Sequence, residues 1–158
     1  MSLFAVQNEK RVIMNKIIDF GSKFIDYKMG LYGAIVMGTI VFVINYYGIL
    51  DLQAASTAAL KQAAYTFMFG GLIMRGCELL ATRIDKKILA MVAAVLVPSL
   101  ISIGLTYGVH SLKGTPKPIE STIPTAILVI PSTAVWGFMK RKEMEKHAES
   151  KSQMQLFD

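Results

Sequence analysis

The chain has 158 residues, of which 53% are hydrophobic and 18% charged, and its formal net charge is +6. Soluble domains are about 45–50% apolar and about 25% charged, so this composition excludes a largely disordered chain, and a single cysteine excludes an intramolecular disulfide framework. The charges concentrate near both ends and in short gaps between long apolar runs. This distribution predicts a small multi-pass membrane protein.

Residues 8–28 have the pattern of an amphipathic helix. Ile13, Ile17, Phe20 and Phe24 share one helical stripe, and lysines and aspartates lie opposite them. We expect this helix to lie in the cytoplasmic interface of the membrane, with its lysines near anionic lipid. The alternative is that the same apolar stripe packs on a partner protein or on a cytoplasmic loop of this chain.

Four later segments are long and apolar enough, or nearly so, to cross a bilayer, which needs about 20 residues. They are residues 29–50, 63–82, 88–108 and 122–140. Lipid satisfies no backbone polar group, so each segment is predicted to be a helix. A charged tail, 141–158, follows, and its end from Ser150 is expected to fray. The predicted fold is an all-α four-transmembrane-helix bundle with an N-terminal cytoplasmic amphipathic helix, in one membrane domain over residues 1–158.

The basic residues predict the orientation of the four spans. Lysine and arginine cluster before the first span, between the second and third, and after the fourth. By the positive-inside rule both termini are cytoplasmic, and residues 51–62 and 108–121 form external loops. The first span is too long for a signal-peptide core, so it acts as an uncleaved insertion signal. The expected location is the cytoplasmic (inner) membrane of a bacterium.

Loop residues indicate where two of the helices begin. Asp51 can cap a helix that continues into the second span. One glycine and two prolines within 114–118 favour a turn followed by extended chain. After that segment, Ser121 or Thr122 is expected to cap the fourth span, with Pro124 in its first turn.

Small residues recur at four-residue spacing in the first span, at Gly30, Ala34 and Gly38. This spacing lets another helix approach closely. The favoured interpretation is packing inside the bundle, and the alternative is a face for self-association or for a larger membrane complex.

Arg75 is the most informative charged residue, because it lies near the centre of the second predicted span. An arginine at the centre of a span costs at least about 2.5–3.5 kcal/mol, so we expect it to face the bundle interior, with Glu78 as a candidate partner. Carbonyls freed by Pro98 and Pro131 offer further acceptors. The remaining members of this predicted mid-membrane polar cluster are hydroxyl residues: Ser99, Ser102, Ser132 and Thr133. The cluster is interpreted as a polar clasp or, alternatively, as a pocket for an anionic ligand group.

The second external loop carries chemically capable side chains, at His110, Lys113, Thr115 and Glu120. Their spacing matches no catalytic motif and no metal-ligand pattern. We therefore expect no metal, no cofactor and no enzymatic activity. Nucleic-acid binding is not expected either, because the basic residues follow the membrane topology instead of forming a basic face with stacking aromatics.

The leading function hypothesis is a non-enzymatic structural or accessory component of the membrane, whose partners are the lipid bilayer and a possible homo-oligomer or larger membrane complex. The second hypothesis is a small transporter or channel, formed by oligomerisation around the Arg75 region. The third is a membrane enzyme that uses the loop 108–121. No family resemblance guides the choice.

Overall fold

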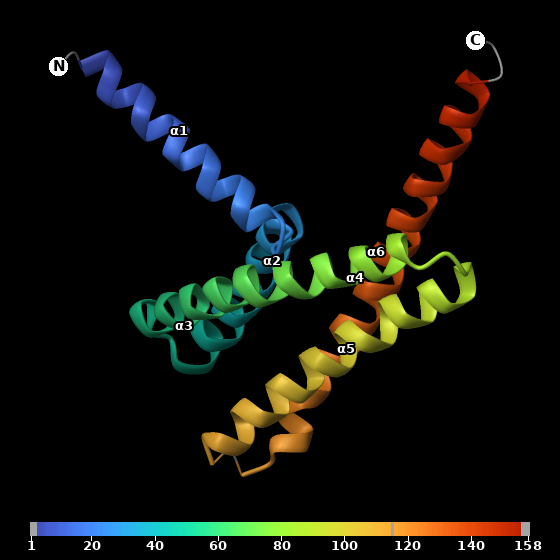
Figure 1. Ribbon diagram of the computed structural model, residues 1–158. Coiled ribbons are helices and arrows are strands. Elements are labelled where there is room, and N and C mark those ends of the chain that lie inside the picture. The colour runs from blue at the N-terminus through green and yellow to red at the C-terminus, as the bar shows by residue number, and fades with distance from the viewer. Residues whose placement is uncertain (1–2, 115, 156–158) are drawn as a thin grey trace. The chain divides into compact units, whose positions relative to one another are not determined.

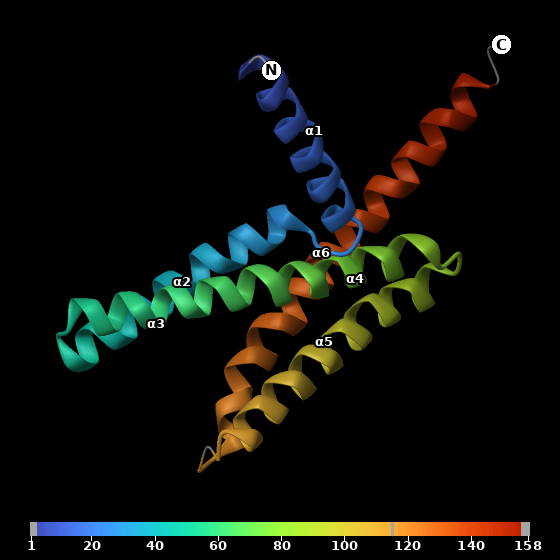
Figure 2. The same ribbon diagram turned by 60° about the vertical axis from the view of Figure 1, so that its left-hand side comes forward.

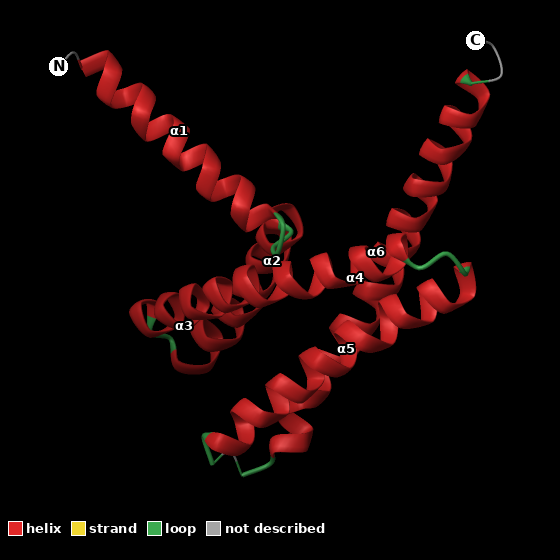
Figure 3. Cartoon of the chain, viewed as in Figure 1, coloured by secondary structure: helices red, strands yellow, loops and turns green. Residues whose placement is uncertain are grey.

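All regular elements that the structure describes are helices. The computed structural model describes residues 3–114 and 116–155 (Figures 1 and 3). Its elements are α1 (Leu3–Ser22), α2 (Tyr27–Ile49), α3 (Leu52–Tyr65), the π-helical turn η1 (Thr66–Gly70), α4 (Gly71–Arg83), α5 (Lys87–Leu112) and α6 (Pro118–Met154). The all-α prediction is therefore confirmed. Contacts divide the chain into two compact units, Met1–Arg75 and Gly76–Asp158, which are described separately.

Three helices within the described residues are long and apolar enough to cross a membrane. They are Tyr27–Gly48 with 22 residues, Lys87–Leu112 with 26 and Pro118–Met154 with 37. These correspond to the first, third and fourth predicted spans. The second predicted span, 63–82, is not one of the three: it is divided among α3, η1 and α4, and it contains Arg75 and Glu78.

The N-terminal segment was predicted to be one helix to residue 28. In the structure α1 ends earlier, at Ser22. The carbonyl of Gly21 accepts hydrogen bonds from the backbone N–H groups of Phe24 and Ile25, at 3.0 and 2.9 Å, which closes the last turn. Asp26 then caps α2, with its carboxylate accepting from the N–H of Met29 at 3.0 Å. A capping aspartate directly after this closing turn explains why the chain starts a new helix here.

Most of the predicted external loop 51–62 is helical, which agrees with the expectation that a helix capped by Asp51 continues into the second span. Asp51 caps α3 as expected, since its carboxylate accepts from the N–H groups of Gln53 and Ala54 at 2.8 and 3.0 Å. The helical path then continues through η1 into α4, as far as Arg83. An alanine-rich sequence favours this helix, because alanine has the highest helix propensity of all residues.

In the first unit α2 and α3 lie side by side and antiparallel (Figure 2). Gly38 faces Ala59 and Ala63 of α3, and Gly30 faces the carbonyl of Phe67 in η1. A Cβ atom on Gly30 would lie 2.5 Å from that carbonyl oxygen, so only glycine permits this approach. Residues 59–71 therefore lie along the N-terminal half of α2, so the stretch that pairs with α2 begins before the predicted second span, 63–82.

In the second unit α5 and α6 form an antiparallel pair, which Figures 1 and 2 both show. Cys77 and Ala81 of α4 pack with Ala94 of α5 into a buried cluster, against which Trp136 of α6 also packs. Gly137 permits the close approach, since a Cβ there would lie 3.3 Å from the Ala94 Cβ atom. Small residues thus bring these three helices together, as is common in membrane proteins.

Helix α6 begins earlier and ends later than the sequence predicted. Pro118 is its first residue, so Ser121 and Thr122 do not cap it. Proline suits a first helical position because its φ is preset and its missing N–H would be unpaired there anyway. The Thr122 hydroxyl instead donates to the Pro118 carbonyl at 2.8 Å. Within the described residues α6 continues to Met154, and the expected fraying from Ser150 stays a prediction.

Candidate functional site

The structure brings together one pair from the predicted polar cluster. Ser99 of α5 and Thr133 of α6 are both buried, and their hydroxyl oxygens lie 3.1 Å apart. The Thr133 hydroxyl also lies within hydrogen-bonding distance of the carbonyls of Val129 and Ile130, at 2.9 and 3.0 Å. Each hydroxyl follows a helix proline within two residues. The pair therefore gives polar contact to the α5–α6 interface beside two prolines, where backbone hydrogen bonds are missing.

Of the other two hydroxyl residues of the predicted cluster, Ser132 bonds through its hydroxyl within its own helix, and Ser102 takes part through its backbone carbonyl. The exposed Ser132 donates to the Leu128 carbonyl at 2.7 Å. The Ser102 carbonyl accepts from the Thr106 hydroxyl at 2.9 Å. Local bonds of this kind satisfy serine and threonine inside a helix without a partner from another helix.

Arg75 lies at one end of the first unit. Its Nε donates to the carbonyl of Lys23 at 3.3 Å, and the N–H of Asp26 donates to the Gly71 carbonyl at 3.0 Å. The turn between α1 and α2 is thereby tied to the start of α4. This acceptor is a loop carbonyl that the sequence reasoning did not include, because it placed residue 75 near the centre of the second span and looked for acceptors at that depth.

Glu78 belongs to the second unit, where its carboxylate lies 3.9 Å from the Nζ of Lys140. Lys140 also lies over the ring of Trp136, 4.9 Å from its centroid. The grouping of Arg75 with Glu78 and the hydroxyl residues stays a prediction, as Arg75 is part of the first unit.

The external-loop candidates surround the turn between α5 and α6. His110 is in the last turn of α5, Lys113 follows as its C-cap, and Glu120 is in the first turn of α6. Thr115 lies outside the described residues. Across the residues that are described, no three His, Cys, Asp or Glu side chains are grouped in a way that could hold a metal ion.

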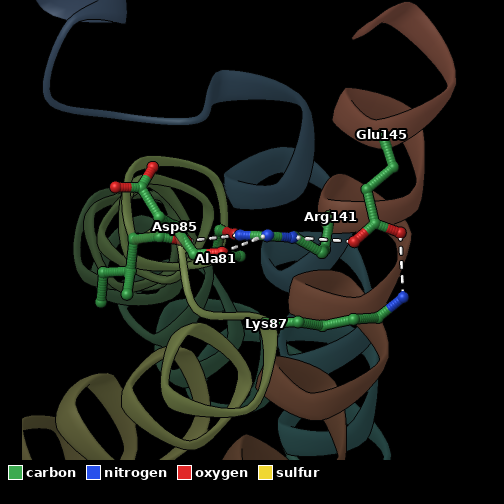
Figure 4. A network of polar contacts seen from close by, with 6 residues as sticks. Ala81, Asp85, Lys87, Arg141 and Glu145 are labelled. Carbon is green, nitrogen blue, oxygen red and sulfur yellow. Dashed lines mark hydrogen bonds and ion pairs between the residues drawn. The ribbon is translucent and has the colours of Figure 1, made fainter. Parts of the chain in front are cut away.

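A buried arginine that sequence reasoning missed organises the other end of the α5–α6 pair (Figure 4). Arg141 is only 7% exposed. Its Nη1 donates to the carbonyls of Ala81 and Ile84 at 3.2 and 2.5 Å, and its Nη2 donates to that of Asp85 at 2.9 Å. The last carbonyls of a helix have no partner within the helix. Arg141 therefore fastens the end of α4 and the turn into α5 to α6.

Glu145 completes this Arg141 cluster, which we define as Arg141, Glu145, Lys87 and the carbonyls of Ala81, Ile84 and Asp85. The carboxylate of Glu145 accepts from the Nε of Arg141 and from the Nζ of Lys87, each at 3.0 Å (Figure 4). The hydrogen bond from Lys87, followed by that from Arg141, holds the pKa of Glu145 below its ordinary value of 4.5. Glu145 is therefore ionised at neutral pH and balances one of the two cations.

The geometry of the Arg141 cluster suits structural fastening, with the guanidinium satisfied by carbonyls and one carboxylate. Sequence reasoning counted Arg141 only as one of several basic residues that set the topology. One signal was present, the i,i+4 spacing of Arg141 and Glu145, but exposed helix pairs share that spacing. The carbonyls to which Arg141 donates are 56 or more residues away from it in sequence. No local pattern therefore indicated this contact.

Comparisons with known proteins do not assign the chain to a family: no family model matches it, and neither a curated protein nor a solved structure is significantly similar.

Proposed function

We propose that this chain is an integral membrane protein that crosses the bilayer four times, with both termini cytoplasmic, and that it acts as a non-enzymatic structural or accessory component of the membrane. The four passages are α2, the helical stretch from Leu52 to Arg83, α5 and the first part of α6. A bacterial cytoplasmic membrane remains the proposed location.

The observation that carries this proposal is the apolar outer surface of the helices in both units. Large apolar side chains project from α2 and α5 with 41–66% of their surface exposed: Leu31, Ile35, Val36, Ile40, Val43, Ile44, Leu96, Leu100, Ile101 and Leu105. Monomeric soluble proteins rarely expose contiguous apolar surface on this scale. In a bilayer the same side chains contact hydrocarbon, so their exposure carries no penalty.

The Arg141 cluster supports the proposed sidedness of the second unit. It places the turn after α4 and the region of residues 141–145 at the same end of the α5–α6 pair. Lys113, the C-cap of α5, and Pro118, the first residue of α6, lie at the opposite end. Lysine and arginine are denser at the first of these ends, which the positive-inside rule makes cytoplasmic.

Thiol labelling in intact cells tests the four-pass topology. We expect single cysteines at Gln53 and Ser111 to react with an impermeant thiol reagent, and a cysteine at Ser150 to react only after the cells are opened. All three positions are exposed in the structure. The native Cys77 is buried, so the unmodified chain supplies a low background. Labelling of Ser150→Cys alone in intact cells would mean that the orientation is the reverse of the proposed one. Labelling of only one of the two external positions would mean that the chain does not cross the membrane twice between residues 53 and 111.

A second candidate function, a channel or transporter built from several copies, is favoured by one observation on α3. Gln53, Thr57 and Lys61 are exposed and follow one another at four-residue spacing. Lys61 lies between Ala59 and Ala63, which contact Gly38 at the middle of α2. If α2 crosses the membrane, this polar stripe reaches the bilayer centre, where lipid accommodates it poorly. A polar surface on a second copy could cover the stripe.

Substitution of Lys61 by leucine distinguishes the two candidates. If α3 faces lipid, Lys61→Leu should favour membrane insertion by about 3 kcal/mol, the difference between the two residues at a helix centre. An insertion assay on the full chain, with a glycosylation acceptor next to Asp51, measures this. Lys113→Leu is the control, because residue 113 is in a turn outside the spans. Unchanged or weaker insertion of Lys61→Leu would favour the multi-copy assembly, in which Lys61 has a polar environment.

A further inference from the structure

A hollow with a basic rim and an apolar floor lies next to the Arg141 cluster, between the start of α5 and the middle of α6. Its volume is about 200 Å³, and its lining is Lys87, Met91, Phe138, Arg141, Lys142 and Glu145. A second, more open hollow on the other side of Lys87 is lined by Lys86, Ile88, Leu89 and Val92. Both depressions therefore combine lysine with aliphatic or aromatic side chains.

The polar and apolar parts of the first hollow are arranged by helix geometry. Met91 follows Lys87 by one turn of α5, and Phe138 precedes Lys142 by one turn of α6. Because α5 and α6 are antiparallel, both apolar side chains lie on the side of the membrane interior. The step from a lysine to its apolar neighbour is about 5.4 Å, one helical turn. This matches the change from headgroup to acyl chain at a bilayer surface.

Charge at the rim is predominantly positive. Lys87, Arg141 and Lys142 face one carboxylate, that of Glu145. Lys87 is held to Glu145 by an ion pair of 3.0 Å, yet 61% of its side chain stays exposed. An exposed lysine of this kind can exchange its partner for another anion at small cost, because surface ion pairs contribute little stability. Arg141 is buried and fastens backbone carbonyls, so Lys87 and Lys142 are the cations available to a ligand.

We propose that this hollow binds the headgroup of an anionic phospholipid, with the phosphate between Lys87 and Lys142 and the acyl chains over Met91 and Phe138. The inference rests on the proposed function, since it needs the α5–α6 pair to lie in a membrane with residues 87 and 142 at the surface. Juxtamembrane basic residues bind anionic lipid by the same electrostatic attraction, and pockets between helices add specificity for the headgroup.

Native mass spectrometry of the full chain in mild detergent tests the proposal, with phosphatidylglycerol and phosphatidylcholine as the two added lipids. The wild type should retain phosphatidylglycerol in preference. The double variant Lys87→Gln/Lys142→Gln should lose about 25-fold in its affinity for phosphatidylglycerol, since each basic residue near an anionic lipid contributes a factor of about five. Glu145→Gln should bind phosphatidylglycerol more tightly, because it removes the only carboxylate of the lining.

The matched control is Lys113→Gln/Lys151→Gln, which removes the same charge from the same two helices or their ends, outside the hollow. This control should bind phosphatidylglycerol as the wild type does.

Three results would each overturn the proposal: equal loss of affinity in both double variants, equal retention of the two lipids by the wild type, or weaker binding of phosphatidylglycerol by Glu145→Gln. So would full competition by soluble glycerol phosphate at the concentration of the lipid, because the acyl chains would then contribute nothing. Thiol labelling of the topology is independent of these outcomes, so a failed lipid site and a failed membrane topology can be told apart.

Discussion

Replacing Arg141 by alanine should destabilise the second unit by about 3 kcal/mol, among the largest effects of any single substitution in this chain. The guanidinium donates to three carbonyls at the end of α4 and in the following turn, and also to Glu145. Hydrogen bonds from a charged donor contribute about 1.5–3 kcal/mol, and their removal leaves the carbonyls without a partner. Thermal unfolding in lipid-free detergent measures the loss, which corresponds to a decrease of roughly 10 °C in Tm for a chain of this size.

Two variants separate the role of Arg141 in fastening α4 from a general effect of charge. Arg141→Lys keeps the charge but has no planar fork, so it should recover only part of the stability. Arg83→Ala removes an exposed arginine from the same end of α4 and should change Tm little. If Arg141→Ala and Arg83→Ala unfolded at the same temperature, the fastening of α4 to α6 would not be significant for stability.

The sequence predicted the helical fold because the signals for it are local. Long apolar runs indicate helices in any membrane protein, and three of the four predicted spans coincide with helices able to cross a bilayer. The capping of α3 by Asp51 was also predictable, since it depends on one residue and the two N–H groups that follow. The break between α1 and α2 was not predicted, because the apolar stripe of residues 13–24 continues across the turn at Gly21.

The register of α3 against α2 could not be read from hydropathy. Counting apolar residues placed the second span at 63–82, whereas the structure pairs residues 59–71 with the N-terminal half of α2. Small residues decide this pairing: Gly30, Gly38 and Ala63 allow backbones to approach, and they contribute little to a hydropathy profile. The π-helical turn η1 also contributes to the difference between the predicted and the observed register. It rotates the residues that follow it about the helix axis, so other side chains face α2.

The candidate site shows the same division between local and long-range information. Ser99 and Thr133 were both expected near the middle of their helices, and antiparallel pairing of α5 with α6 brings them together. Arg141 and Ala81 are 60 residues apart, and nothing around either residue indicates the other. Charge counting placed Arg141 at the cytoplasmic end of the fourth span, but it did not indicate that Arg141 is buried there and donates to four acceptor groups.

The last prediction concerns Gly30, where α2 and η1 approach most closely. Gly30→Leu should destabilise the first unit by about 3 kcal/mol, because even a Cβ atom would lie 2.5 Å from the carbonyl oxygen of Phe67. That neighbour is backbone, so the added side chain fits only if η1 moves away from α2. Leucine has a helix propensity about 1 kcal/mol better than glycine, and this gain opposes the steric cost without cancelling it.

Gly104→Leu is the matched control for Gly30→Leu, because it makes the same chemical change inside another apolar helix. No atom among the described residues lies within 4 Å of a Cβ built on Gly104, apart from its own helix. We therefore expect Gly104→Leu to leave Tm unchanged or to raise it through the gain in helix propensity. Thermal unfolding of both variants in the same detergent compares them directly.

Equal Tm for the two variants would show that α2 does not pack on η1 at this distance. The register of the α2–α3 pair would then have to be revised. A lower Tm for Gly30→Leu alone would tie the stability of the first unit to the smallest residue in its helix contact.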